Sequence, residues 1–267
     1  MTAEFSNGKQ VALVTGASGG IGLELAKVFA REGYNLVLVA RSGGKLNELA
    51  AQFGVQYGIQ TKVIAKDLVQ PSAPDEIFGE LESAGVVVEV LVNNAGFASY
   101  GRFTEADVQS QLQMMQLNMV TLTHLTRLFL PGMIGRRSGK MMNVASTAAF
   151  APGPLMAVYY ATKAYALSFS EAVAEEVRDQ GVTVSALCPG PTESGFQERA
   201  AMQESKLVQN GLMSSTVVAE AGYKGLMAGK TVIIPGMTNK IGALLPRFTP
   251  RRMTARMVMN MQERVGH

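Results

Sequence analysis

Cysteine, histidine and long apolar runs are scarce in this chain of 267 residues. The single cysteine, Cys188, excludes an internal disulfide, suits a reducing compartment and is expected to be a small buried side chain. No run of about 18 apolar residues is present, so we expect no transmembrane helix. Residues 1–10 include Glu4 and Lys9 and lack the apolar core of a secretory signal. We therefore expect a cytoplasmic protein, and we expect no metal site.

An excess of charge of one sign is also lacking over most of the chain. Residues 1–239 hold 18 cations and 20 anions, whereas residues 240–267 hold six cations and one anion. The net charge of +3 therefore combines a body of charge −2 with a C-terminal segment of charge +5. A nucleic-acid-binding protein carries a basic face with groove-reading elements, so no nucleic-acid partner is expected.

Hydrophobic residues make up 47% of the chain and gather in seven short runs separated by stretches with helical spacing. The runs span residues 11–15, 35–40, 61–65, 86–92, 140–145, 182–187 and 231–234. They are apolar almost throughout, which is typical of parallel strands covered on both faces. The sequence predicts a single-domain, doubly wound α/β fold of Rossmann type, with helices on both faces of a seven-stranded parallel sheet. Ligands bind such a fold beyond the carboxyl ends of the strands.

A glycine-rich turn follows the first predicted strand and precedes a helical pattern; it reads Thr15-Gly-Ala-Ser-Gly-Gly-Ile-Gly22. Glycines let the backbone approach a pyrophosphate, whose charge the helix N-terminus stabilises, so phosphate binding is predicted rather than a purely structural turn. Ser18 also fits the Gly-x-Ser-x-Gly elbow of hydrolases. However, only about ten residues precede this strand, and His124 lies within a predicted helix. A Ser-His-Asp hydrolase is therefore not expected.

The second predicted strand is followed by Arg41 and Ser42, and residues 35–42 contain no acidic residue. NAD sites usually place a carboxylate here for the ribose 2′-hydroxyl, whereas an arginine accommodates the 2′-phosphate of NADP. We therefore expect the cofactor to be NADP(H), with Arg41 and Ser42 contacting the phosphate. Asp67 and Leu68 follow the third strand, where the adenine would lie, although Asp67 could instead cap the next helix.

Ser146 follows the fifth predicted strand, Tyr159 comes thirteen positions later, and Lys163 lies four residues after the tyrosine. Residues four apart share one helix face, so the phenol and the ammonium can point into one site. An ordinary tyrosine pKa of about 10 suits proton transfer at neutral pH poorly, and a nearby ammonium lowers that pKa. A Tyr-x-x-x-Lys pattern alone also arises in ordinary amphipathic helices.

Several motifs occur in register over residues 11–192: Thr15-Gly-x-x-x-Gly-x-Gly22, Asp67, Asn93-Asn-Ala-Gly96, Asn118, Ser146, Tyr159-x-x-x-Lys163 and Pro189-Gly-Pro-Thr192. Together they resemble the short-chain dehydrogenase/reductase family, in its single-domain, NADP-preferring branch. The resemblance implies that Tyr159 exchanges a proton with the substrate oxygen, that Ser146 polarises this oxygen and that Lys163 lowers the tyrosine pKa. Asn118 would position a water that refills the proton relay.

The same resemblance implies a set of cofactor contacts along the carboxyl edge of the sheet. The expected residues are Gly16, Ser18, Gly20, Ile21, Gly22, Arg41, Ser42, Asp67, Leu68, Asn94, Ala95, Gly96, Tyr159, Lys163, Pro189, Gly190 and Thr192. The implied activity is NADP(H)-dependent hydride transfer to an apolar ketone or from the corresponding alcohol. A reductase of 3-oxoacyl thioesters is an alternative, and so is an NADP-binding sensor or scaffold without turnover.

The substrate region is expected in a lid over residues 192–215, with Phe196, Met202, Leu207, Leu212 and Met213 either contacting an apolar substrate or closing the core. Residues 237–267 form a basic C-terminal extension. Thr249 and Pro250 there resemble an N-cap and a first helical residue. The extension also carries methionines at positions 253, 257 and 261. Packing of these methionines, or a subunit contact, is favoured over membrane contact. The family resemblance implies a homodimer or homotetramer built around helices near Asn118 and Tyr159.

Overall fold

The computed structural model describes residues 5, 7–195 and 211–263. Seven strands form one sheet in the order β3-β2-β1-β4-β5-β6-β7, and every neighbouring pair is parallel. The strands are β1 (Val11–Thr15), β2 (Asn35–Ala40), β3 (Thr61–Ala65), β4 (Val88–Asn93), β5 (Gly139–Val144), β6 (Val182–Leu187) and β7 (Val232–Ile233). The predicted doubly wound fold is confirmed.

Four strands have the bounds that the sequence predicts, and the other three differ at their ends. The predicted run 86–92 begins too early, because the Val86 amide donates to Leu81 O at the end of the preceding helix, and β4 starts only at Val88. Strand β5 lies one residue earlier than predicted, at Gly139–Val144, and β7 is reduced to Val232–Ile233. These small shifts leave the order of the ligand-facing loops unchanged.

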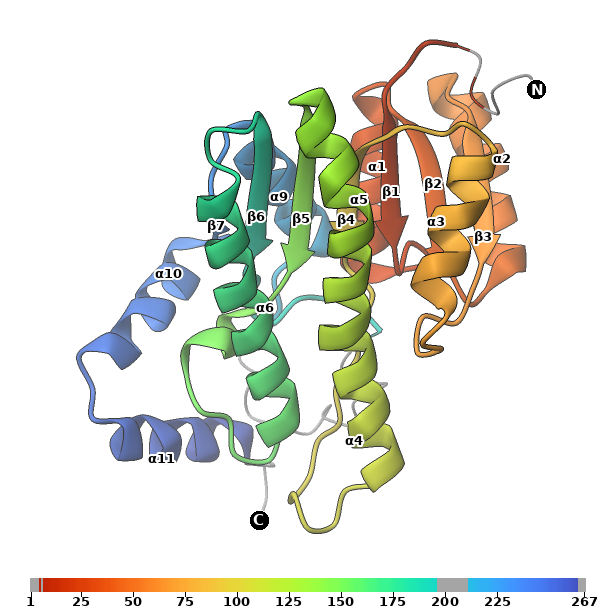
Figure 1. Ribbon diagram of the computed structural model, residues 1–267. Coiled ribbons are helices and arrows are strands. Elements are labelled where there is room, and N and C mark those ends of the chain that lie inside the picture. The colour runs from red at the N-terminus through yellow and green to blue at the C-terminus, as the bar shows by residue number, and fades with distance from the viewer. Residues whose placement is uncertain (1–4, 6, 196–210, 264–267) are drawn as a thin grey trace.

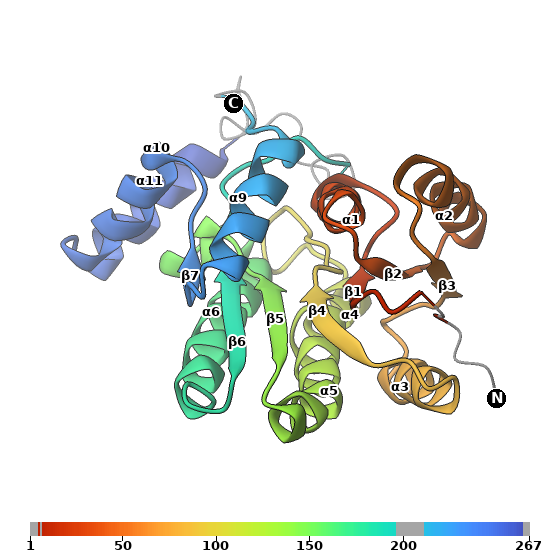
Figure 2. The same cartoon turned by 90° about the horizontal axis from the view of Figure 1, so that it is seen from above.

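Helices cover both faces of the sheet, as Figure 2 shows from above. On one face lie α1 (Gly20–Arg31), α2 (Gly43–Tyr57) and α9 (Ser215–Met227). On the other lie α3 (Ala73–Ser83), α4 (Val108–Met115), the π-helical turn η1 (Gln116–Thr121), α5 (Leu122–Arg136) and α6 (Ala157–Glu176). A short helical turn, η2 (Thr147–Phe150), follows β5.

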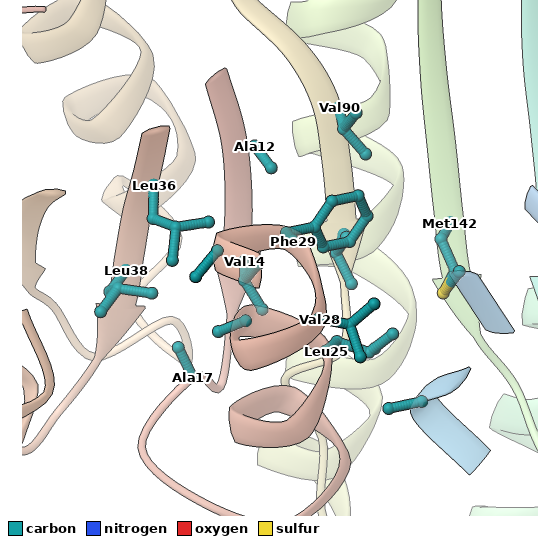
Figure 3. Close-up of a cluster of buried hydrophobic side chains, with 14 of the residues drawn as sticks. Ala12, Val14, Ala17, Leu25, Val28, Phe29, Leu36, Leu38, Val90 and Met142 are labelled. Carbon is teal, nitrogen blue, oxygen red and sulfur yellow. The ribbon is translucent and has the colours of Figure 1, made fainter. Parts of the chain in front are cut away.

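The core between α1 and the sheet shows why residues 20–31 form a helix. Leu25, Val28 and Phe29 recur at helical spacing and form one buried cluster with strand residues such as Val14 and Val90 (Figure 3). Leu25 and Phe29 are fully buried. Burial of each such side chain stabilises the fold by about 1.5–3 kcal/mol. This packing fixes α1, and therefore its N-terminal glycine turn, against β1.

The C-terminal arm, which we define as residues 237–262, extends from the body beside α6 (Figure 1). It consists of α10 (Met237–Leu244), η3 (Leu245–Arg247) and α11 (Arg251–Gln262). The predicted cap is wrong: Pro250 takes the N-cap position, and the Thr249 hydroxyl donates to Leu245 O at 3.0 Å. None of the described helices combines the length and apolarity needed to cross a membrane.

The methionine stripe of α11 is only partly buried. Met253, Met257 and Met261 keep exposed fractions of 56%, 40% and 47%. The buried positions of α11 are instead Thr254 and Gln262, because α11 turns this neighbouring face toward the body. The methionines thus pack only in part against their own chain, and the other favoured possibility, a subunit contact, stays a prediction.

The predicted lid over residues 192–215 is described only at its two ends. Thr192 and Met213 form a parallel bridge, in which the Glu193 amide donates to Met213 O and the Met213 amide donates to Pro191 O. Phe196, Met202 and Leu207 lie outside the described residues. Ser215, the predicted last residue of the lid, already begins α9.

Candidate active site

A single cavity of about 1510 Å³ lies at the carboxyl edge of the sheet and extends from the glycine turn to the C-terminal arm. Sites for one drug-sized ligand usually enclose about 300–1,000 Å³, so this cavity has room for two ligands side by side. Every site residue predicted from the sequence lines it except Gly22 and Asn118.

The glycine turn is held close to the next strand loop, and two of its glycines are required for that contact. Gly16 has a φ of +67°, and a Cβ there would lie 2.8 Å from Asn94 Nδ2. A Cβ on Gly22 would lie 2.3 Å from both Asn94 Nδ2 and Gly16 O. Gly22 therefore serves the packing of α1 against the loop rather than the cavity itself.

Gly19 has a different role. The glycine motif does not reveal this role, because position 19 is one of the motif's variable positions. It lines the cavity, has an extended backbone and would place a Cβ in open space. Gly19 is also the N-cap of α1, and no side chain caps this helix end. Free amides at a helix N-terminus bind anions, and here a bare backbone leaves them accessible from the cavity.

Asn94 connects the β1 and β4 loops. Its side-chain amide donates to Thr15 O at 2.9 Å, and its backbone amide donates to the Thr15 hydroxyl oxygen at 2.9 Å. The Thr15 hydroxyl donates in turn to Val92 O. Asn94 lines the cavity, as predicted, but its polar groups are engaged in shaping the loop.

Two cations lie together where β2 meets α2. Arg41 and Lys45 line the cavity and are exposed, and neither forms an ion pair with any residue that the structure describes. Arg41 was predicted from the sequence and Lys45 was not, because Arg41 precedes the N-cap of α2 and helical spacing therefore does not relate the two residues. Ser42, also predicted, is the N-cap of α2, and its hydroxyl makes no capping hydrogen bond. This corner of the cavity is suited to a phosphate group.

Asp67 and Leu68 lie after β3, as predicted, and both line the cavity. The alternative that Asp67 caps the next helix is wrong, because α3 begins at Ala73 with Ser72 as its N-cap. Asp67 Oδ1 instead accepts a hydrogen bond from the Val69 amide at 3.2 Å. Leu68 is buried, and its carbonyl accepts from the Thr121 hydroxyl.

Tyr159 and Ser146 meet across the cavity from α6 and the end of β5. Ser146 is the polar neighbour that lowers the pKa of the Tyr159 phenol, and the Ser146 hydroxyl donates to Pro189 O at 3.4 Å. Tyr159 is 9% exposed. Burial raises the pKa of Tyr159 well above its ordinary value, and Ser146 only partly offsets this. At neutral pH the Tyr159 phenol is therefore protonated.

Lys163 lies one helical turn after Tyr159 and is 7% exposed. Its ammonium donates to Val144 O at 2.7 Å and lies 5.8 Å from the centre of the Tyr159 ring. Burial lowers the pKa of Lys163 to about 8. Desolvation of the phenol is the largest influence on the Tyr159 pKa and raises it, and the lowering of this pKa by Lys163 stays a prediction.

Asn118, in η1, is buried and is joined to two neighbouring segments. Its side-chain amide donates to Phe97 O at 3.0 Å and to the Thr162 hydroxyl oxygen at 3.1 Å, while Oδ1 accepts from the Phe97 amide. A Cβ on Gly96 would lie 2.9 Å from Asn118 Oδ1. The side chain thus joins the β4 loop to α6, and the positioning of a water by Asn118 stays a prediction.

The loop after β6 closes the side of the cavity next to Ser146. Pro189, Gly190 and Thr192 line it, as predicted. A Cβ on Gly190 would lie 2.3 Å from Asn239 Oδ1, so this glycine permits a close approach of α10. Thr192 is buried and donates to Gly190 O at 2.8 Å.

The positions of His124 and Cys188 bear on the hydrolase alternative. His124 lies on α5 with Nε2 3.2 Å from Asp75 and is not among the cavity-lining residues. Cys188, predicted as a buried small side chain, is fully buried, and burial raises the pKa of its thiol to about 12. Among the described residues, the titratable groups next to Ser146 in the cavity are therefore Tyr159 and Lys163.

A sequence model described as short chain dehydrogenase matches residues 10–205, which is most of the chain. The chain belongs to the short-chain dehydrogenase/reductase family. A very-long-chain 3-oxoacyl-CoA reductase of Phaeosphaeria nodorum is 38% identical over 179 residues, covering 65% of this chain and 52% of that protein. The chain thus spans about half the length of this curated relative.

Two solved structures of the family extend the likeness to nearly the whole chain. A short-chain dehydrogenase from Sphingobium yanoikuyae in complex with NADPH is 29% identical, covers 97% of both chains and gives a TM-score of 0.81. The bulky-bulky ketone specific alcohol dehydrogenase from Comamonas testosteroni is 28% identical, covers 97% of this chain and 96% of its own, and gives a TM-score of 0.77.

The C-terminal arm, outside the matched region of the family model, closes the far end of the cavity. Gln262 of α11 is buried, and its Nε2 donates to the Tyr160 hydroxyl oxygen at 2.7 Å. The Tyr100 hydroxyl donates to Gln262 O at 2.6 Å. Met257, Val258 and Met261 also line the cavity. No sequence motif pointed to these contacts, which join segments more than 100 residues apart.

Proposed function

We propose that the chain is an NADP(H)-dependent oxidoreductase that transfers a hydride between the nicotinamide and an apolar ketone or alcohol, with Tyr159 as general acid and base. The observation that carries this proposal is that Tyr159, Ser146 and Lys163 line the same cavity as the glycine turn. A proton donor for the substrate oxygen and an anion-binding turn thus open into one space. Membership of the family supports the reaction class.

The residues present fit a dinucleotide with a 2′-phosphate. The bare backbone at Gly19 and the N-terminus of α1 suit a pyrophosphate, and Arg41 with Lys45 suits a further phosphate. When bound, NADPH supplies the hydride. The S. yanoikuyae neighbour, which was solved with NADPH, supports this choice of cofactor.

In the reducing direction, Tyr159 donates its proton to the substrate oxygen. Because burial keeps the phenol protonated, it acts as an acid at neutral pH. Ser146, which lines the cavity beside Tyr159, would polarise the substrate oxygen through its hydroxyl. Lys163 contributes a positive charge beside the ring, which stabilises the phenolate that remains after proton transfer.

At the substrate end of the cavity, toward the C-terminal arm, Met257, Val258 and Met261 form an apolar part of the lining. An apolar carbonyl compound suits these walls. A second candidate substrate is a 3-oxoacyl thioester. It is supported by the name of the similar P. nodorum protein, a very-long-chain 3-oxoacyl-CoA reductase. Its acyl chain would extend along the same methionine-lined wall.

The experiment is a set of NADPH-oxidation assays with bulky apolar ketones and 3-oxoacyl thioesters, with the Tyr159→Phe variant as control. The expected result is turnover by the wild type and a loss of about 10²–10⁴-fold in kcat for Tyr159→Phe, with NADPH affinity retained. Turnover of thioesters alone would favour the second candidate. If both proteins bind NADPH and neither turns over any substrate, the chain is a sensor or scaffold and the proposal is wrong.

We also propose that the protein is a homo-oligomer. Exposed apolar side chains gather on α4 and η1, at Val108, Leu112, Met115 and Val120. This surface lies on the helices that the family resemblance assigned to subunit contacts. Light scattering of the wild type and of Leu112→Glu tests the proposal, which predicts a lower mass for the variant.

A further inference from the structure

The C-terminal arm exposes apolar side chains along its whole length. The exposed residues are Met237, Ile241, Leu244, Leu245, Phe248, Met253, Met257 and Met261. Phe248, at the bend between the two helices of the arm, is 79% exposed. Single exposed apolar residues need no explanation, but a continuous series of this size marks a contact surface.

The same arm carries five cations and no acidic residue between residues 237 and 262. The cations are Lys240, Arg247, Arg251, Arg252 and Arg256. All five are exposed, and none forms an ion pair with the described part of the chain. A partner of the arm must therefore be apolar and carry negative charge.

The helical spacing of α11 separates three faces. Thr254 and Gln262 turn toward the body and are buried. The methionines at 253, 257 and 261 form a stripe along one flank, since residues four apart lie on one face. Arg252 and Arg256 lie four residues apart on the remaining flank. Apolar and cationic side chains thus border each other along the exposed surface of α11.

We propose that the exposed surface of the C-terminal arm docks on an anionic lipid bilayer. Helices that lie in the membrane interface combine apolar side chains, which enter the acyl boundary, with arginines and lysines that contact anionic headgroups. A second copy of the chain fits less well, because two arms facing each other would bring five unpaired cations against five. The unpaired charge therefore favours a lipid surface as the occupant.

Docking would place the substrate cavity beside the membrane. Leu245, Met257 and Met261 are exposed on the arm and also line the cavity. An apolar compound dissolved in the bilayer would then reach the cavity along the arm without crossing water. This consequence for the substrate rests on the proposed function, whereas the docking itself does not.

The test is co-sedimentation of the full chain with vesicles of phosphatidylcholine alone or of phosphatidylcholine with phosphatidylserine, in the absence of any substrate. We expect binding to the anionic vesicles that weakens as salt is added. The Arg251→Glu/Arg252→Glu variant is expected to bind at least about tenfold more weakly. The matched control is Lys224→Glu/Lys230→Glu, which changes the charge equally on and just after α9 and should bind as the wild type does.

The Phe248→Ser/Met253→Ser variant removes two exposed apolar side chains and tests their contribution to docking. It is expected to bind the anionic vesicles more weakly at every salt concentration. Absence of wild-type binding to anionic vesicles would overturn the proposal, and so would equal loss in the arm and control charge variants. A third outcome would also overturn the proposal: the wild type does not bind vesicles, and its molar mass in solution rises with concentration unless Phe248 is replaced by serine. The arm would then bind a second copy of the chain instead. Because no turnover is measured, these outcomes are independent of the proposed catalytic function.

Discussion

Gln262 of α11 donates a hydrogen bond of 2.7 Å to the hydroxyl oxygen of Tyr160, the residue that follows the proposed acid Tyr159. The rings of Tyr159 and Tyr160 meet edge to face, with centroids 6.1 Å apart. Gln262 also accepts the Tyr100 hydroxyl at its backbone carbonyl. The last described helix is thereby joined to the helix of the proposed catalytic residues.

The first prediction concerns this connection. Gln262→Leu removes the side-chain hydrogen bond to Tyr160 and loosens α11 at the substrate end of the cavity. A hydrogen bond contributes about 0.5–1.5 kcal/mol, so we expect KM for an apolar carbonyl substrate to rise about two- to tenfold. The kcat and the Kd for NADPH should stay unchanged, because Tyr159, Ser146 and the glycine turn are not altered.

Tyr160→Phe is the matched variant, because it removes the other partner of the same bond. Steady-state kinetics of both variants and of the double variant measure the coupling between them. A double variant no worse than either single variant is expected. Independent, additive losses would contradict the prediction, and so would a weakened Kd for NADPH in either single variant.

The second prediction separates two glycines of the same turn. Gly22→Ala places a Cβ 2.3 Å from Gly16 O, so the backbone must shift, and we expect a loss of about 1–3 kcal/mol in the free energy of unfolding. Gly19→Ala meets no atom within 4 Å and keeps an extended backbone, so its stability should change by less than about 0.5 kcal/mol.

The affinity for NADPH, unlike the stability, should be strongly reduced by Gly19→Ala. Its new methyl group would project into the cavity above the N-terminus of α1, and we expect the Kd for NADPH to rise at least about tenfold. Urea unfolding and NADPH titration of both variants check the pair. Unchanged NADPH affinity in a folded Gly19→Ala protein would show that the cofactor does not approach this backbone.

The strands and the proposed catalytic set could be predicted because their signals are local. The apolar runs define the strands, and the four-residue spacing brings Tyr159 and Lys163 to one helix face. The environment of these groups could not be predicted in the same way. The raised pKa of Tyr159 depends on its burial with side chains remote in the sequence, such as Ala98 and Met114.

The contacts of Asn118 and Gln262 could not be predicted from the sequence either. Asn118 bonds to Phe97 and Thr162, and Gln262 bonds to Tyr160, across 21 to 102 residues of chain. A motif identifies such a residue type but not its partners, which depend on how helices pack. The partial exposure of the α11 methionines could not be predicted for the same reason: helical spacing defines a stripe but not the direction that it faces.

The third prediction concerns cofactor choice at Arg41 and Lys45. A hydrogen bond to a charged group contributes about 1.5–3 kcal/mol, so Arg41→Ala should raise the Kd for NADPH about 10- to 100-fold. The Kd for NADH should change little, since NADH lacks the 2′-phosphate. Lys45→Ala should act in the same direction with a smaller effect, because a lysine makes no bidentate contact.

Isothermal titration with both cofactors measures the selectivity of each variant. Lys230→Ala is the control, because this exposed cation lies just before β7, at the opposite edge of the sheet. Equal losses of NADPH and NADH affinity in Arg41→Ala would mean that Arg41 does not distinguish the two cofactors.

The fourth prediction is a pH dependence of stability due to Lys163. Burial lowers the pKa of Lys163 from 10.5 to about 8, so the folded chain releases this proton at a lower pH than the unfolded chain does. Between about pH 8 and pH 10.5 the unfolded state therefore binds more protons, and the free energy of unfolding rises with pH. The full change is of the order of 3 kcal/mol, and below pH 8 the cost of burying the charge is complete.

Lys163→Met lacks this titration, so the difference in unfolding free energy between wild type and variant should shift in favour of the wild type from pH 7 to pH 9.5. Cys188, whose pKa burial raises to about 12, destabilises both proteins as pH rises and largely cancels in the difference. Urea unfolding at the two pH values measures the effect, and Lys230→Met, at an exposed lysine, should show none. A difference between wild type and Lys163→Met that stays constant with pH would mean that Lys163 keeps an ordinary pKa in the folded chain, and its ammonium would then remain fully charged beside Tyr159 throughout the neutral range.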